Sequence, residues 1–408
     1  MEERVLDVPS HVPRRARAAA MVAFATNGAL PATLLARYAE VKDHLALSPA
    51  TFGVVVVGFT IGAAGAFHLP GMVLRRMGMR WTTVIGTAWI ALALVVTASG
   101  VAVGSAAIFV AGLILAGFGD AVVDVAQNAQ GLRVQEVYGR SVLTSMHAGW
   151  SIGAAIGGMV GTAAASAGMP LTLHLVTWGA LCVIAMATAA RLFLPDGRRP
   201  TAEETTTGPL SRRAMLSLAP LALVALAGIS VEDVGNNWSA VLLSTERDVP
   251  ASSAGIGLSV LLAAQFIGRL VGDRYIDRVG GRTALITSLS AVAVGLALVA
   301  WSPGAVSTLA GLALAGLGCA ITVPLAFARA DALPGLRPHA GVTWIGWVMR
   351  TATIALSPAI GGVATASSLP VAVSAVALIA VLALGLQLRS GDAPMVRQGV
   401  DGGFSRIR

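Results

Sequence analysis

The sequence has 408 residues, of which 56% are hydrophobic and only 12% are charged. Soluble domains carry about 25% charged residues, so this composition excludes an ordinary soluble enzyme, a disordered chain and a fibrous protein. The mean hydropathy of +0.78 predicts a polytopic membrane protein. The net charge of +8 does not indicate nucleic-acid binding, because the basic residues form short clusters between apolar segments.

Apolar segments of about 20 residues recur along the whole chain, as transmembrane helices require. The long continuous runs exclude a β-barrel, whose strands alternate apolar and polar residues. We therefore expect an all-α membrane protein. Its twelve predicted spans are residues 17–38, 50–74, 81–101, 104–130, 142–166, 171–193, 216–243, 253–274, 283–302, 304–328, 341–366 and 369–388.

The distribution of arginine and lysine predicts the orientation of the chain. Of the 28 basic residues, 24 fall on the side of the two termini and 3 on the other side, with one inside a span. The positive-inside rule then places both termini in the cytoplasm, and we expect the cytoplasmic membrane of a bacterium. Residues 195–214 are the one long polar stretch in the middle of the chain, so they predict a cytoplasmic linker between halves 1–194 and 215–408.

The two halves repeat each other. The run Arg76–Arg80 aligns with Arg278–Arg282, and Ala154–Gly158 aligns with Pro358–Gly362, at offsets of 202 and 204 residues. Two further matches occur in the same order. A duplicated unit of six helices keeps both halves in the same orientation, as in transporters that rock one half against the other.

A loop motif in each half carries a family resemblance. The chain resembles a major facilitator superfamily transporter, whose signature between the second and third helices is Gly-x-x-x-Asp-Arg-x-Gly-Arg-[Arg/Lys]. The second copy retains Asp277, Arg278, Gly280 and Arg282, and the first retains Gly71, Arg76, Gly78 and Arg80. Arg75 stands where the first copy's acid belongs. The resemblance implies that this loop gates the cytoplasmic side, with an altered latch in the first half.

Two departures bear on the kind of transporter within that superfamily. Gly112 occupies the fourth-helix position at which many proton-driven drug exporters carry arginine. The fifth-helix exporter motif is present only as Gly153-Ala154-x-x-Gly157-Gly158. The pattern is similar to a poorly characterised bacterial branch and favours a solute symporter over a drug exporter.

Ionisable residues inside spans are the best functional pointers, since each costs about 2.5–3.5 kcal/mol unless it is paired or hydrated. Asp120, Asp124 and Asn128 share one face of the fourth predicted helix. His147 lies at a similar depth on the fifth, so a pair with Asp124 is geometrically feasible. The alternative is that Asp124 is structural and pairs with an arginine of the following loop.

The seventh predicted helix carries Glu232, Asp233 and Asn236 close to Gly228 and Gly235, which permit a bend. Adjacent acids cannot point the same way, so we expect one to face a central cavity and the other a neighbouring helix. The alternative places this cluster at the hydrated membrane interface. Asn27 on the first helix is a further candidate for the cavity, or for a simple hydrogen bond between helices.

Arg350 is predicted to be the one basic residue deep in a span, nine residues into the eleventh helix. A lone buried guanidinium requires an acid or an anionic ligand. With Trp347 beside it, Arg350 forms a surface suited to a sugar, an aromatic solute or a carboxylate. The alternative is a structural ion pair with Asp331 at the cytoplasmic gate.

Rows of small residues spaced four apart occur on helices 2, 5, 8 and 11. They are Gly58, Gly62 and Ala66; Gly149, Gly153, Gly157 and Gly161; Ala264, Gly268 and Gly272; and Thr353, Ser357, Gly361 and Thr365. Such rows let helix backbones approach closely in lipid. Either they form a sliding seam between the halves, as the resemblance implies for these four helices, or they serve static packing.

These patterns together predict a secondary active transporter of a small solute, coupled to protons through Asp120, Asp124 or Glu232 and working by alternating access. No ATP-binding motif, catalytic constellation or metal cluster is present, so we expect no enzyme activity, no catalytic or metal site and no cofactor. The expected partners are a small molecule, protons and the lipid bilayer, without nucleic acid, and the expected state is a monomer. The alternatives are a proton-driven efflux antiporter for drugs or metabolites and an uncoupled facilitator, and a channel fits the repeat less well.

Overall fold

The computed structural model describes residues 11–66, 69–138, 143–195, 212–331, 333 and 340–389, giving the backbone only for 11–13, 143–145, 147, 212–214 and 331. The regular elements of these residues are helices. They are α1 (His11–Leu35), α2 (Tyr38–His44), α3 (Pro49–Gly65), α4 (Leu69–Ala102), α5 (Ala106–Tyr138), α6 (Leu143–Ser166), α7 (Leu171–Ala189), α8 (Arg212–Asp233), α9 (Ser239–Glu246), α10 (Ile256–Val279), α11 (Gly281–Trp301), α12 (Ala305–Cys319), α13 (Thr322–Asp331), α14 (Ala340–Ala366) and α15 (Leu369–Arg389). A short 3₁₀ turn follows α7 (Ala190–Leu192), and the π-helical turn η2 (Val234–Trp238) joins α8 to α9.

Nine segments of the described residues are long and apolar enough to cross a membrane. Helices α3, α6 and α14 lie at the three remaining predicted positions, so the arrangement is consistent with twelve spans. The expected second span was too long, because α3 ends at Gly65 and α4 already begins at Leu69. Of the predicted linker 195–214, residues 196–211 lie outside the described part of the chain, and residues 212–214 already belong to α8.

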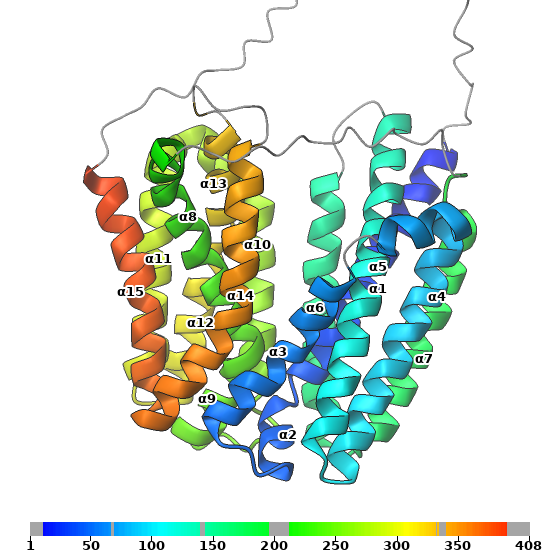
Figure 1. The fold of residues 1–408 in the computed structure, drawn as a ribbon, viewed down its shortest axis with the longest axis horizontal. Coiled ribbons are helices and arrows are strands. Elements are labelled where there is room, and N and C mark those ends of the chain that lie inside the picture. The colour runs from blue at the N-terminus through cyan, green and yellow to red at the C-terminus, as the bar shows by residue number, and fades with distance from the viewer. Residues whose placement is uncertain are drawn as a thin grey trace, which may run out of the picture.

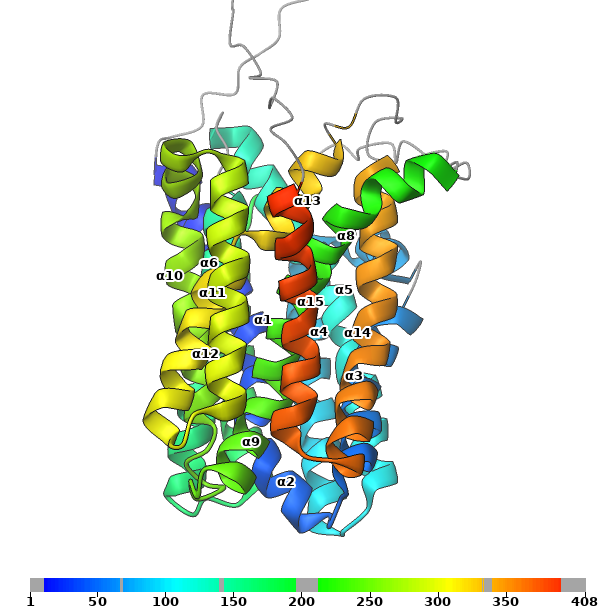
Figure 2. The same cartoon turned by 90° about the vertical axis from the view of Figure 1, so that its left-hand side faces the viewer.

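The helices form two groups that meet along a central interface (Figure 1). Helices α4, α5 and α7 lie on one side and α8, α11 and α15 on the other, with α3, α6, α10 and α14 between them. Across the interface α3 packs against α14 and α6 packs against α10, and Figure 2 shows both pairs from the side. The start of α1 and the end of α15 lie at the same end of the bundle, which we call the termini end.

The small-residue rows are divided between static packing and the interface. On α6, Gly153 lies directly against the carbonyl of Ala25 on α1, within the first half. Rows on α3 and α10 likewise face α5 and the α12–α13 segment of their own halves. For three of the four rows the contacts therefore favour the static-packing alternative over the seam. Only the α14 row lies at the interface, where Gly361 meets the backbone of Pro49 on α3.

The repeated loop motif has the same backbone conformation in both halves. Gly78 has φ 74° and ψ 166°, and Gly280 has φ 81° and ψ 151°. Only glycine adopts this region without strain. The glycines that the internal repeat aligns are therefore also equivalent in structure, since each breaks the chain between two helices.

Candidate functional site

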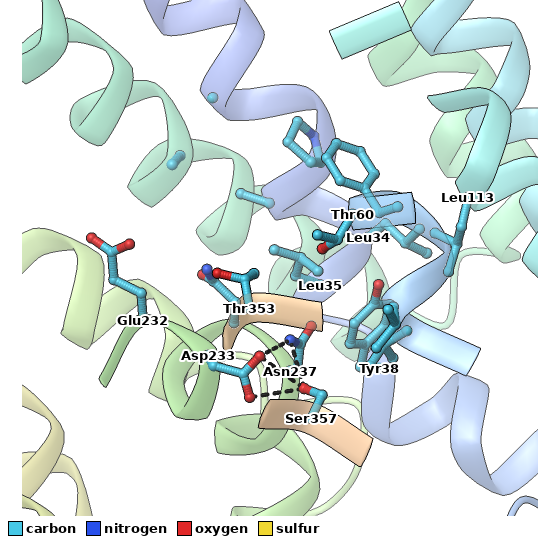
Figure 3. A pocket seen from close by; sticks show the side chains of 18 of the residues that line it. Leu34, Leu35, Tyr38, Thr60, Leu113, Glu232, Asp233, Asn237, Thr353 and Ser357 are labelled. Atoms are coloured by element: carbon cyan, nitrogen blue, oxygen red, sulfur yellow. Dashed lines mark hydrogen bonds between the residues drawn. The ribbon is translucent and has the colours of Figure 1, made fainter. Parts of the chain in front are cut away.

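A cavity of about 220 Å³ lies between the two halves, near the middle of the bundle. Its lining comes from both halves: α1, α2, α3, α4, α5 and α6 on one side, and α8, η2, α10 and α14 on the other. Figure 3 shows the opposed walls, with Asp233 and Ser357 facing Leu35 and Tyr38 across the cavity. Substrate sites of transporters built from two such halves lie at this position, between the repeats.

The bundle is closed at the end opposite the termini. There the Ala50 backbone amide donates to Thr365 Oγ1 at 2.9 Å, which joins α3 to α14. The hydroxyl of Ser166 donates to the carbonyl of Ser252 at 3.1 Å and joins the end of α6 to the loop before α10. Phe52 and Trp238 make an edge-to-face ring contact at 5.4 Å between centroids. These contacts seal the interface below the cavity.

Asp233 ties the π-helical turn η2 to α14. Its carboxylate accepts hydrogen bonds from Ser357 Oγ at 2.8 and 2.9 Å and from Asn237 Nδ2 at 2.9 Å. Trp238 Nε1 also donates to Ser357 Oγ, at 3.2 Å. π-Helical turns are frequent at functional sites. Here the turn places Asp233 and Asn237 on the cavity wall, at the bend that Gly235 was expected to permit.

Glu232 points the other way, toward α10. Its Oε1 accepts from Gln265 Nε2 at 2.6 Å and pairs with Arg269 at 3.2 Å. Arg269 also donates to Ser151 Oγ of α6 at 2.8 Å, so the ion pair extends across the interface. The adjacent acids thus diverge as expected, but both reach the cavity lining.

The polar face of α5 forms a separate cluster nearer the termini end. Asp124 is exposed and accepts hydrogen bonds from Gln127 Nε2 at 3.1 Å and Asn128 Nδ2 at 3.0 Å. Asp120, one turn away, accepts a hydrogen bond from the side chain of Asn27 on α1. These residues are therefore brought together, outside the lining of the central cavity. The proposed partner of Asp124, the side chain of His147, lies outside the described residues.

Curated relatives match this sequence over most of its length. The uncharacterised transporter y4wD of Sinorhizobium fredii is 30% identical over 382 residues, covering 92% of this chain and 96% of the relative. An uncharacterised MFS-type transporter of Yersinia pestis is 29% identical over 350 residues, covering 83% and 86%. The chain belongs to the major facilitator superfamily.

Solved structures agree with this assignment, although no family model matches the sequence. A point mutant of the nucleoside transporter NupG aligns with a TM-score of 0.70 at 15% identity, over 92% of this chain and 99% of NupG. A bacterial homologue of the human lysosomal transporter Spinster, in an inward-facing unoccupied conformation, gives 0.67 at 12%, over 93% and 97%. At these identities the likeness shows the fold alone.

Arg350 of this superfamily member is not buried, contrary to the prediction. Arg350 and Trp347 are both exposed on α14, and the guanidinium lies 5.9 Å from the Trp347 ring centroid. The prediction failed because depth along a helix does not determine which way a side chain points. Neither residue lines the central cavity, although cavity-lining Thr353 follows Arg350 by one turn. The side chain of Asp331 lies outside the described residues.

The gating-loop residues of the transporter lie at the termini end. Arg75, Arg76, Arg80, Asp277 and Arg278 are exposed, and Gly71 lies in the first turn of α4. Arg282 Nη2 donates to the backbone carbonyl of Leu388 on α15 at 3.3 Å. The position of the loop agrees with the role that the resemblance implies, and that role remains a prediction.

Sequence reasoning missed Arg269. It was counted among the basic residues of the cytoplasmic loops, yet it lies ten residues before the end of α10 and pairs with Glu232. Arg350 is therefore not the one basic residue within a span. The sequence contains a pattern that indicates this site, because Gln265 and Arg269 are four residues apart and place two polar side chains on one face of an apolar helix. Asn237 and Ser357 were also missed as site residues, since hydroxyls and amides on apolar helices are common.

Proposed function

We propose that the chain is a proton-coupled secondary transporter of a small solute in the cytoplasmic membrane of a bacterium, with both termini in the cytoplasm. In this proposal residues 1–194 and 215–408 rock against each other around the central cavity. The observation that carries the proposal is that cavity, lined by both halves and sealed at the end opposite the termini. In this proposal the joined end faces away from the cytoplasm.

Coupling to protons is supported by acidic residues in the cavity lining and on α5, between the cavity and the termini end. Glu232 pairs with Arg269 on the cavity wall, so a proton on Glu232 releases Arg269 and weakens the bridge to Ser151. Asp120 and Asp124 form the second candidate group on α5. The fold also hosts proton symport elsewhere, since the Escherichia coli fucose:proton symporter FucP aligns with a TM-score of 0.56 at 16% identity.

Flux measurements in proteoliposomes test this proposal. A thermal-shift screen of sugars, carboxylates and aromatic solutes on purified protein first supplies a transported compound. We expect its uptake to be saturable and to rise when a pH gradient is imposed. The variant with Asp120→Asn, Asp124→Asn and Glu232→Gln together should lose the response to the gradient. Full gradient-driven flux in this triple variant would refute proton coupling through these acids.

The same assay separates the alternatives. Saturable uptake with counterflow but no response to the gradient identifies an uncoupled facilitator. Solute accumulation only when the imposed pH gradient drives protons in the direction opposite to the solute identifies an efflux antiporter. Linear flux without counterflow identifies a channel, and it would overturn alternating access itself.

A further inference from the structure

The two walls of the central cavity differ in chemistry. The wall from the second half carries carboxylate, amide and hydroxyl groups, and the wall from the first half is mainly aliphatic and aromatic (Figure 3). The polar side chains include Glu232, Asp233, Asn236, Asn237 and Ser357. The facing side chains include Leu34, Leu35, Tyr38, Val56 and Leu113. A ligand that fills this space needs one polar end and an apolar body.

The polar wall has an excess of negative charge. Among the described residues that line the cavity, none is basic. The charge of Glu232 is offset by Arg269, which lies 3.2 Å away behind the wall. Asp233 is only 6% exposed, and its hydrogen-bond partners within the described chain are the neutral donors Ser357 and Asn237. Its charge is therefore left without a nearby cation, which favours a positively charged ligand group.

Aromatic side chains extend this preference. Tyr38, Phe59 and Trp150 all contribute to the cavity lining. The faces of aromatic rings attract ammonium groups and also pack against apolar ligand atoms. A carboxylate ligand would instead meet two acids and no basic lining residue, which disfavours its binding electrostatically.

We propose that the central cavity binds a small organic cation, an amine whose ammonium group faces Asp233 and the amides of Asn236 and Asn237. Its apolar body lies on the leucine-rich wall of the first half. The cavity volume of about 220 Å³ lies below the roughly 300–1,000 Å³ of typical ligand pockets, which favours a small solute. This inference rests on the proposed function in one respect, that the cavity is the transport site. It assigns Asp233 to the substrate and leaves Asp120, Asp124 and Glu232 for protons.

Equilibrium binding to the purified full-length protein at pH 7 tests the substrate class. The probes are benzylamine, benzyl alcohol and benzoate, which share one ring and differ in the charge of the attached group. We expect benzylamine to bind at least about tenfold more tightly than benzyl alcohol, because charge-assisted hydrogen bonds are roughly twice as strong as neutral ones. Benzoate should bind most weakly. No binding of benzylamine, equal binding of the amine and the alcohol, or tighter binding of benzoate would overturn the proposal.

The variant Asp233→Asn localises the effect. It should reduce the affinity for benzylamine to about that for benzyl alcohol, about tenfold, and leave the affinity for the alcohol unchanged. Asp43→Asn is the matched control, since Asp43 lies on α2 with its side chain 58% exposed, and its carboxylate lies 3.9 Å from Lys42. Retention of the full amine preference in Asp233→Asn would overturn the assignment of Asp233. The wild-type series decides the charge preference whether or not this variant folds.

Binding needs neither a membrane nor a pH gradient. The binding result can therefore contradict the proposed substrate class while the flux assay supports proton-coupled transport, or the reverse. A proton-coupled transporter of acids would pass the flux assay and prefer benzoate. An uncoupled transporter of amines would fail the gradient test and still prefer benzylamine.

Discussion

The ion pair between Glu232 and Arg269 gives the most quantitative prediction. Its N–O distance is 3.2 Å, and two unit charges at that distance attract by about 5 kcal/mol at an effective dielectric constant of about 20. The two side chains are 37% and 29% exposed, so water screens part of this attraction. Breaking a buried pair costs about 3–5 kcal/mol. We therefore expect about 2–3 kcal/mol for the loss of either partner.

The perturbation is a double-mutant cycle of Glu232→Gln and Arg269→Met. Arg269→Met leaves Gln265 as the partner of the Glu232 carboxylate among the described residues, and it removes the hydrogen bond to Ser151. Glu232→Gln leaves a guanidinium without its acid. In the double variant neither charge remains, so the loss should be smaller than the sum of the single losses, with a coupling energy of about 1–3 kcal/mol.

The assay is chemical and thermal unfolding of the four proteins in one detergent. For a chain of this size, 1 kcal/mol corresponds to about 1 °C in Tm, so each single variant should shift Tm downward by about 2–3 °C. Arg274→Met is the control, because Arg274 is exposed on the same helix. Additive losses in the double variant, or an equal loss from Arg274→Met, would refute the inferred role of the pair.

Three further predictions concern helix packing and closure. Gly361→Ala should lower the free energy of unfolding by about 1–3 kcal/mol and impair flux, because the added Cβ would collide with the α3 backbone. The matched control is Gly362→Ala, whose Cβ would meet open space, and it should be neutral or slightly stabilising. A tolerated Gly361→Ala would contradict the close α3–α14 contact. Gly280→Ala should cost about 1–3 kcal/mol despite open space around it, since its φ of 81° is unfavourable for alanine; unchanged unfolding would contradict that conformation. A Ser166→Cys, Ser253→Cys pair should form a disulfide under oxidation, because the two hydroxyl oxygens lie 3.3 Å apart, and it should stop flux until it is reduced; continued flux of the oxidised protein would rule out opening at this end.

The spans and the internal repeat could be predicted from sequence because both depend on local composition. Twenty apolar residues must form a helix in lipid, whatever their neighbours are. The glycines of the repeated loop were aligned by spacing alone, and Gly78 and Gly280 have matching backbone angles. The polar stripe of Asp124 and Asn128 also followed from helical spacing.

The contacts between helices were predicted less well. Four-residue spacing identifies a face of a helix but not the helix that covers it. The spacing of the α6 glycines allowed either the seam or static packing, and the structure places them against α1. The same limit applied to Arg350, whose position along α14 was known but whose exposure was not.

The sequence by itself determined the membrane class, the helical segments and the duplicated architecture, because hydrophobicity and spacing act along one chain. Only the tertiary structure decided which polar groups meet. Glu232 and Arg269 are 37 residues apart in sequence, and Asp233 and Ser357 are 124 apart. Their pairing depends on how the helices rotate and pack, and that rotation divides the cavity into an acidic wall and an apolar wall.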